Sequence, residues 1–300
     1  MKLFLENVNL NSNSGPNSFG QKLFKYMPSL GVTFSEDPEP NAYLCFIESG
    51  RATYNAPLYQ RLDGIYFNSA FDYTAQNSNI KRTYDMSTGV IFQSNFNKEL
   101  TFKYFGPHSN YAIIHNGADI NLINSVEDIK IDKYENIWSC ASSWRPHKRL
   151  NENIRYFLEH SSPNDGLIVA GSVPERIKYD RVHYVGDLPT EKLFSLYKAS
   201  KYFLHLAWLD HCPNVVVDAV ACGCTVICSN AGGTKEIAGK NAIIVQENDW
   251  NYEPVELYNP PAMNFDNKLE NIWHENSEYD MLSVSKKYYN FINGGLDGRN

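Results

Sequence analysis

The second half of this 300-residue chain alternates short apolar runs with helical patterns, and this alternation constrains the fold more than any other feature. The runs lie at residues 136–141, 166–170, 182–185, 202–206, 225–228 and 242–245. Runs that are apolar throughout are typical of strands buried on both faces of a parallel sheet. Helical spacing of apolar residues follows three of them, at residues 149–159, 189–199 and 213–221. The order predicts a doubly wound α/β domain.

The first half repeats the pattern more weakly. Strands are predicted at residues 2–5, 42–47, 64–67, 89–93 and 111–114, and helices at 21–27 and 97–104. A polar, charged stretch, Asp119–Tyr134, separates the halves. We predict two Rossmann-like domains facing a cleft, one over residues 1–132 and one over 133–285, with a helix end and tail at 286–300 that could return to the first domain. Ligands of such folds bind at the carboxyl ends of the strands.

Composition excludes several classes of protein. The chain is 43% hydrophobic and 20% charged, which is typical of a globular protein and not of a disordered one. A formal net charge of −7 argues against nucleic-acid binding, which needs a basic face. No stretch approaches the roughly 20 apolar residues of a membrane helix, and the N-terminus lacks the apolar core of a signal peptide. We therefore expect a cytoplasmic protein without a transmembrane segment.

The six cysteines show no spacing typical of a disulfide framework, and the chain is long enough not to need one. A zinc site could be sought among His211, Cys212, Cys222 and Cys224. This group lacks any C-x-x-C pair, so reduced, buried thiols are the favoured interpretation and no metal site is expected.

The segment from Leu206 to Ile237 carries most of the recognisable chemistry. A predicted strand leads into a loop with Asp210, and a predicted helix then begins near Cys212, Pro213, Asn214 and Val215. The free N–H groups of a first helical turn favour an anion. Asp210 in the loop, and Asp218 one turn into the helix, can accept hydrogen bonds from sugar hydroxyls. The pair Gly232-Gly233 lets the backbone approach a ligand closely.

This segment resembles the nucleotide-sugar site of retaining glycosyltransferases with the GT-B fold, in particular the large fourth sequence family. That family has two acidic residues separated by seven, then an A-C-G turn, a strand and a Gly-Gly loop with a Glu. Asp210 and Asp218 have this separation, followed by Ala221-Cys222-Gly223 and by Gly232-Gly233 with Glu236. Both acidic residues are usually Glu, so the side chains here are one methylene shorter and their hydroxyl contacts must tighten or pass through water.

A second matching block, residues 142–150, follows the first strand of the second half. The family places an Arg and a Lys here on the donor diphosphate, and Lys148 falls on the Lys. Ser143 stands at the usual Arg position, so the second cation must be Arg145 or Arg149, or be absent. Cations at a helix start oppose the helix dipole, which favours a ligand over a solvated basic face. The resemblance implies that these cations stabilise the leaving diphosphate.

The remaining resemblances rest on fewer residues. Gly15, within the loop of residues 15–20, matches a Gly-rich loop near donor and acceptor, and Gly186 matches a loop beside the nucleotide base. Many family members carry a His near the reacting carbon, but residues 1–107 contain none. Asp63, Asn68 and Asn17 are the acceptor-side candidates. An ordinary ion pair between Asp63 and its strand neighbour Arg61 is the more conservative interpretation.

The resemblance implies an enzyme that moves a sugar from a UDP- or GDP-sugar to an acceptor hydroxyl, on a glycan or glycoconjugate, with retention. Lys148, Arg145 and Asp210 would act at the reacting centre, and no cofactor is expected. The absence of any Asp-x-Asp sequence fits a metal-independent enzyme. Two alternatives stay open: an inactive protein of the same fold that binds nucleotide sugars or glycans, and a nucleotide-sugar epimerase. Transfer to an acceptor would indicate the glycosyltransferase, binding without turnover the inactive protein, and an isomerised donor the epimerase.

Overall fold

The computed structural model describes all residues except 13, 35–38, 174, 267, 270–278 and 298–300. The described residues form two compact units. The first comprises Met1–Gly117, Tyr252–Val255 and the helix α8 (Met281–Asp297), and the second comprises Ala118–Asn251 with the described part of Glu256–Ser277. The chain thus passes from one unit to the other at Gly117, then returns to the first unit for its last helix.

This division differs from the boundary expected at residue 132. The helix α4 (Ile120–Ser125) packs on α6 (Thr190–Ala199) of the second unit. Lys198 on α6 donates to the Val126 carbonyl oxygen at 2.9 Å and pairs with Asp128 at 2.5 Å. The polar segment Asp119–Tyr134, predicted to separate the halves, therefore belongs to the second unit.

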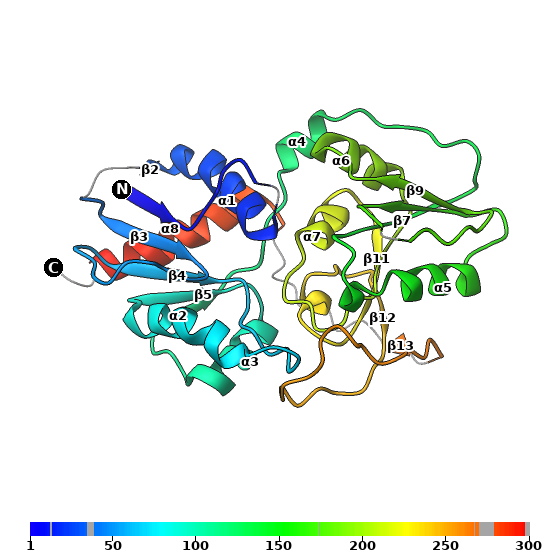
Figure 1. The fold of residues 1–300 in the computed structure, drawn as a ribbon. Coiled ribbons are helices and arrows are strands. Elements are labelled where there is room, and N and C mark those ends of the chain that lie inside the picture. Colours follow the sequence, from blue (N-terminus) through cyan, green and yellow to red (C-terminus); the bar gives the residue numbers. More distant parts are fainter. Residues whose placement is uncertain (13, 35–38, 174, 267, 270–278, 298–300) are drawn as a thin grey trace. The chain divides into compact units, whose positions relative to one another are not determined.

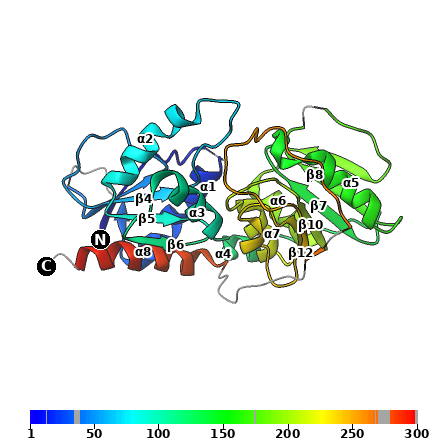
Figure 2. The ribbon, with the colours of Figure 1, turned by 90° about the horizontal axis from the view of Figure 1, so that it is seen from below.

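The first unit contains a six-stranded parallel sheet in the order β2-β1-β3-β4-β5-β6. The strands are β1 (Lys2–Glu6), β2 (Thr33–Phe34), β3 (Ala42–Phe46), β4 (Leu58–Leu62), β5 (Gly89–Phe92) and β6 (Tyr111–Ile113). The helices are α1 (Gly15–Tyr26), followed by the 3-10 turn η1 (Met27–Leu30), then α2 (Tyr73–Met86) and α3 (Asn95–Phe105). The helices α1 and α8 cover one face of this sheet, and α2 and α3 cover the other (Figures 1 and 2).

One predicted strand of the first unit is wrong. Residues 64–67 form no strand, and the strand of this region is β4, Leu58–Leu62. Gln60 and Arg61 interrupt the apolar run of β4, yet both side chains are fully buried. Arg61 is held with its guanidinium against two phenylalanine rings, at 4.1 and 4.7 Å from their centroids. A buried arginine with such partners behaves as a core residue, and apolar patterning does not detect it.

The second unit contains a seven-stranded sheet in the order β13-β12-β11-β10-β7-β8-β9. The strands are β7 (Ile137–Ala141), β8 (Gly166–Ala170), β9 (Val182–Gly186), β10 (Tyr202–His205), β11 (Thr225–Ser229), β12 (Ile243–Val245) and β13 (Lys268–Leu269). Among the strands that the structure describes here, β13 alone pairs antiparallel with its neighbour. All six strands predicted for this half are confirmed. The helices α6 and α7 (Asn214–Ala221) cover one face of this sheet, and α5 (Leu150–His160) covers the other (Figure 1).

The strand order locates the point where a ligand is expected in the second unit. The chain runs outward from β7 to β8 and β9, then crosses back to place β10 on the other side of β7. In open α/β sheets, ligands bind at such a reversal, outside the carboxyl ends of the two strands. Among the described residues, no helix is long and apolar enough to cross a membrane.

Candidate active site

Two residues predicted to act at the reacting centre meet at this reversal point. Lys148 ends the 3-10 turn η2 (Pro146–Lys148) after β7, and Asp210 lies in the loop after β10. The Lys148 ammonium donates to Asp210 Oδ2 at 2.5 Å. The two side chains are 18% and 14% exposed, so the pair is shielded but still reachable from solvent. The parallel register of β7 and β10 brings together residues that are 62 positions apart.

A histidine that sequence reasoning missed completes this cluster. His205, the last residue of β10, is 4% exposed, and its Nε2 lies 2.9 Å from Asp210 Oδ2. Burial alone would raise the pKa of Asp210, but the Lys148 ammonium and the His205 hydrogen bond outweigh it and hold the pKa well below its usual range. An ionised carboxylate can only accept, so His205 donates through Nε2–H. The only sequence signal was a polar residue ending an apolar strand.

Two further histidines flank the ion pair without adding charge. Burial, with the nearby Lys148 ammonium, lowers the pKa of His147 to about 3, and burial lowers that of His211 to about 4. Both rings are therefore neutral at pH 7. Within the part of the chain that the structure describes, no group of three or more His, Cys, Asp or Glu side chains is placed to hold a metal ion.

Each member of the ion pair stands next to a residue with left-handed backbone. Arg149, after Lys148, has φ 52°, and Leu209, before Asp210, has φ 55°. This conformation costs a non-glycine residue about 1–2 kcal/mol. Strain of this kind persists where the surroundings enforce it, and it gathers at functional sites.

The two arginine candidates for the second cation differ in their surroundings. Arg149 is 4% exposed and makes a bidentate ion pair with Glu247, in which both hydrogen bonds are 2.8 Å long. It also donates to the Pro261 carbonyl oxygen at 2.8 Å. These contacts hold Arg149 within the second unit, and its contact with the donor stays a prediction. Arg145 is exposed, has no ion-pair partner among the described residues, and borders a groove of about 460 Å³ together with Trp144.

The Gly-Gly loop packs directly on the loop that carries Asp210. Gly233 donates its N–H to the Asp210 carbonyl oxygen at 2.7 Å. Gly232 has φ 98°, and a Cβ there would lie 2.7 Å from the same oxygen. Only glycine fits at position 232, so this loop supports Asp210. Gly186, at the end of β9, has φ 71°, and a Cβ there would point into open space.

The helix α7 begins beside this loop, with Pro213 as its N-cap. Pro213, Asn214 and Val215 are half-buried, whereas Cys212 is only 5% exposed. Cys212 can therefore offer a ligand little more than its backbone. Asp218 lies on the second turn of α7 and is 8% exposed.

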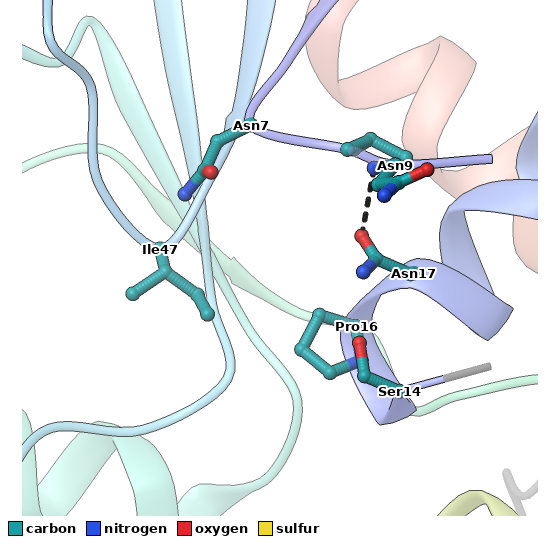
Figure 3. Close-up of a pocket in the computed structure, with 7 residues that line it drawn as sticks. Asn7, Asn9, Ser14, Pro16, Asn17 and Ile47 are labelled. Atoms are coloured by element: carbon teal, nitrogen blue, oxygen red, sulfur yellow. Dashed lines mark hydrogen bonds between the residues drawn. The ribbon is translucent and has the colours of Figure 1, made fainter. Parts of the chain in front are cut away.

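The first unit has a pocket of its own, of about 380 Å³, where β1 and β3 end and α1 begins. Figure 3 shows its lining: Asn7, Val8, Asn9, Ser14, Pro16, Asn17 and Ile47. Asn17 accepts a hydrogen bond from the Asn9 backbone N–H at 2.9 Å, drawn as a dashed line in Figure 3. Gly15, the first residue of α1, stands between two lining residues. Residues 15–20, predicted as a loop, instead form the first turns of α1, and two of them, Pro16 and Asn17, line this pocket.

Two lining residues of this pocket are again left-handed. Asn7 has φ 59° and Ile47 has φ 67°. A β-branched residue is a genuine outlier there. The Ile47 N–H is held by the Arg61 carbonyl oxygen at 2.8 Å, and Asn7 donates its amide to Phe46 at 2.8 Å. Of the five non-glycine residues with positive φ in the described ranges, four thus stand at this pocket or beside the Lys148–Asp210 pair.

The other acceptor-side candidates are engaged in contacts within the first unit. Asp63 follows β4, and its Oδ1 accepts hydrogen bonds from Arg61 and Gln93, as an ion pair with Arg61 predicts. Its Oδ2 is buried without a hydrogen-bond partner. Asn68 is 6% exposed and accepts a hydrogen bond from the Ala70 N–H at 3.1 Å, which stabilises a turn.

Comparison with solved structures identifies the fold. Sucrose-phosphate synthase from Thermosynechococcus elongatus superposes with a TM-score of 0.65 at 13% identity, covering 99% of this chain and 95% of that one. HepE of Anabaena, solved with UDP-glucose, superposes with a TM-score of 0.63 at 15% identity, covering 99% and 98%. The chain therefore has the GT-B glycosyltransferase fold, as expected from the sequence.

The sequence comparisons match part of the chain. Residues 124–252 match the family described as glycosyl transferases group 1. The O-antigen chain mannosyltransferase B of Escherichia coli is 29% identical over 68 residues, which are 23% of this chain and 18% of that protein. This match falls almost entirely within the second unit, and it confirms that the unit resembles the glycosyl transferases group 1 family.

Proposed function

We propose that this protein is a retaining glycosyltransferase that moves a sugar from a nucleoside diphosphate sugar to an acceptor hydroxyl. The observation that carries the proposal is the Lys148–Asp210 pair, which lies at the sheet reversal of the second unit between two left-handed residues. This is where an α/β sheet binds its ligand, and the backbone there is held in a strained, defined shape.

The second unit offers groups for each part of a nucleotide sugar. Lys148 and the exposed Arg145 would contact the diphosphate, and the first N–H groups of α7 would face it with the positive end of the helix dipole. Asp218 on α7 would accept hydrogen bonds from the ribose. Asp210 Oδ1 accepts one hydrogen bond, from the His211 N–H at 3.1 Å, and has capacity left for a sugar hydroxyl.

In the reaction we propose, the bond between the anomeric carbon and the phosphate oxygen breaks as the acceptor oxygen bonds to the same face of that carbon. The acceptor proton passes to the leaving phosphate oxygen, so no protein base is needed, and direct attack on the same face needs no protein nucleophile. Negative charge grows on the diphosphate as the bond breaks. Lys148 would therefore stabilise the transition state more than the bound donor.

For the acceptor we propose the pocket of the first unit. Its lining includes three asparagine side chains, Asn7, Asn9 and Asn17, which suit hydroxyl-rich ligands because an amide can both donate and accept. The acceptor would then be a glycan or glycoconjugate, in line with the chemistry of the mannosyltransferase relative.

The proposal is tested by incubating the purified chain with UDP- and GDP-sugars and a set of oligosaccharide acceptors, with products analysed by mass spectrometry and NMR. Formation of an α-glycoside from an α-linked donor supports retention, and a β-glycoside would contradict it. Binding of a nucleotide sugar without turnover against any acceptor would indicate an inactive binding protein. Recovery of an isomerised donor would indicate an epimerase.

We expect transfer to continue in EDTA. The two cations Lys148 and Arg145 and the α7 dipole would supply the charge that Mg²⁺ supplies to other diphosphate-binding enzymes. The initial rate in excess EDTA should match the untreated rate to within about twofold. Loss of turnover in EDTA that returns on adding Mg²⁺ or Mn²⁺ would overturn metal independence.

We expect Asp218→Asn to weaken donor and product binding equally. A charged hydrogen bond to the ribose is worth about 1.5–3 kcal/mol and is the same in the ground and transition states. The KM for the donor and the Kd for the nucleoside diphosphate should both rise about 10- to 100-fold, with kcat nearly unchanged. Isothermal titration calorimetry measures the Kd, and initial rates measure KM and kcat. A fall in kcat at constant KM would show that Asp218 acts on the reacting centre instead.

A further inference from the structure

The cluster around Asp210 is asymmetric in a way that the proposed donor contacts do not explain. Asp210 Oδ2 accepts from two side chains, Lys148 at 2.5 Å and His205 at 2.9 Å, which lie at the carboxyl ends of the neighbouring strands β7 and β10. Oδ1 accepts only from the backbone N–H of the next residue, at 3.1 Å. Two side-chain donors on one oxygen fix the carboxylate plane and turn Oδ1 away from Lys148.

The side chain of His205, the hydrogen-bond partner of Asp210, is held in place by the core. His205 ends a buried strand, is 4% exposed, and its ring lies nearly parallel to that of Phe203, with an interplanar angle of 11°. Lys148, by contrast, has a long flexible side chain and is 18% exposed. Of the two donors on Oδ2, only His205 therefore has a position set by the core.

Binding of a diphosphate would draw on the same ammonium. When Lys148 turns part of its hydrogen-bonding capacity to phosphate oxygens, Asp210 keeps His205 as its remaining side-chain donor. A buried carboxylate that lost both donors would rotate or take up a proton. A neutral histidine donor avoids this without adding a positive charge that would repel Lys148.

We propose that His205 is a positioning residue, which holds the Asp210 carboxylate through Nε2–H so that Asp210 keeps Lys148 aligned with the leaving group. This role rests on the proposed glycosyl transfer. His205 touches neither donor nor acceptor, and it acts entirely through Asp210.

The first test compares variants of His205 that keep or lose a hydrogen-bond donor at the position of Nε2–H. The glutamine amide can reach the place of Nε2–H, whereas asparagine is too short and leucine has no donor. We expect His205→Leu and His205→Asn to lower kcat about 10- to 100-fold with less than a threefold change in the Kd for the nucleoside diphosphate, and His205→Gln to recover most of kcat. Equal kcat in the Gln, Asn and wild-type proteins would overturn the role.

A double-mutant cycle separates this role from a purely structural one. In the Asp210→Asn background the carboxylate is gone, so His205→Leu should cost little more. His160→Leu, at the exposed end of α5, is the matched control and should leave kcat unchanged in either background. Additive losses from His205→Leu and Asp210→Asn would show that His205 acts independently of Asp210, which contradicts the proposal.

A readout without turnover keeps the inference distinct from the proposed function. In the ¹⁵N spectrum of the histidine side chains, His205 should be the Nε2–H tautomer in the wild type at pH 7. If the wild type shows this tautomer but transfers no sugar, the proposed function fails and the contact stands. If the protonated nitrogen is Nδ1, the positioning role fails whatever the activity.

Discussion

Lys148→Ala is expected to lower kcat by about 10²- to 10³-fold, the effect of removing one preorganised group that stabilises developing negative charge. The donor KM should change far less, because the charge on the diphosphate grows only as the glycosidic bond breaks. Initial rates over a range of donor concentrations measure both constants. Small and equal changes in kcat and KM would show that Lys148 contributes no more than ground-state binding.

Loss of Lys148 also leaves Asp210 with one fewer partner, so stability must be measured beside activity. Lys192→Ala, an exposed lysine on α6 of the same unit, is the matched control and should leave both unchanged. Combining Lys148→Ala with Asp210→Asn removes the uncompensated carboxylate charge. We expect this double variant to regain thermal stability without regaining kcat, which separates the catalytic loss from any folding defect.

Glu247→Ala is expected to produce the largest loss of stability. Glu247 and Arg149 are paired at 2.8 Å with side chains 7% and 2% exposed, and Glu247 also accepts a hydrogen bond from Ser229. Removing one partner of a buried pair leaves a buried, unpaired charge and costs about 3–5 kcal/mol of unfolding free energy. The loss should also release Arg149 from its left-handed conformation beside Lys148.

Urea unfolding followed by tryptophan fluorescence tests this, because Trp138, Trp144, Trp208 and Trp250 all lie in the second unit. The control is Glu159→Ala, which breaks the exposed Arg155–Glu159 pair at 3.4 Å and should cost at most about 0.5 kcal/mol. Glu247→Ala combined with Arg149→Met should recover much of the stability. An effect of Glu247→Ala no larger than that of the control would contradict a structural role for this pair.

The predictions from the sequence were strongest where a single physical rule acted along the chain. The strands of the second unit are apolar throughout because both faces of the sheet are covered, and all six were predicted. The weakest predictions concern the first unit. Its helix α2 (Tyr73–Met86) is mostly polar and was not predicted, and the strand β4 was misplaced because Gln60 and Arg61 are buried polar residues.

For the site, the motif spacing identified Lys148, Asp210 and Gly232 as candidates, and the structure brings all three together in the second unit. The motif spacing could not identify His205, because nothing in an apolar strand indicates that its last residue faces a carboxylate five positions further on. Nor could it separate Arg145 from Arg149. The partner that distinguishes them, Glu247, lies 98 residues away from Arg149.

The sequence by itself determined the fold class and indicated the family that the second unit resembles, because buried strands, helix starts and glycine turns are local requirements of the backbone. The tertiary structure alone decided which charges face each other. Lys148 meets Asp210 and Arg149 meets Glu247 because β7, β10, β11 and β12 end along one edge of the sheet, and that order follows from chain crossovers rather than from spacing. Burial at that edge then sets the protonation of the histidines beside Asp210.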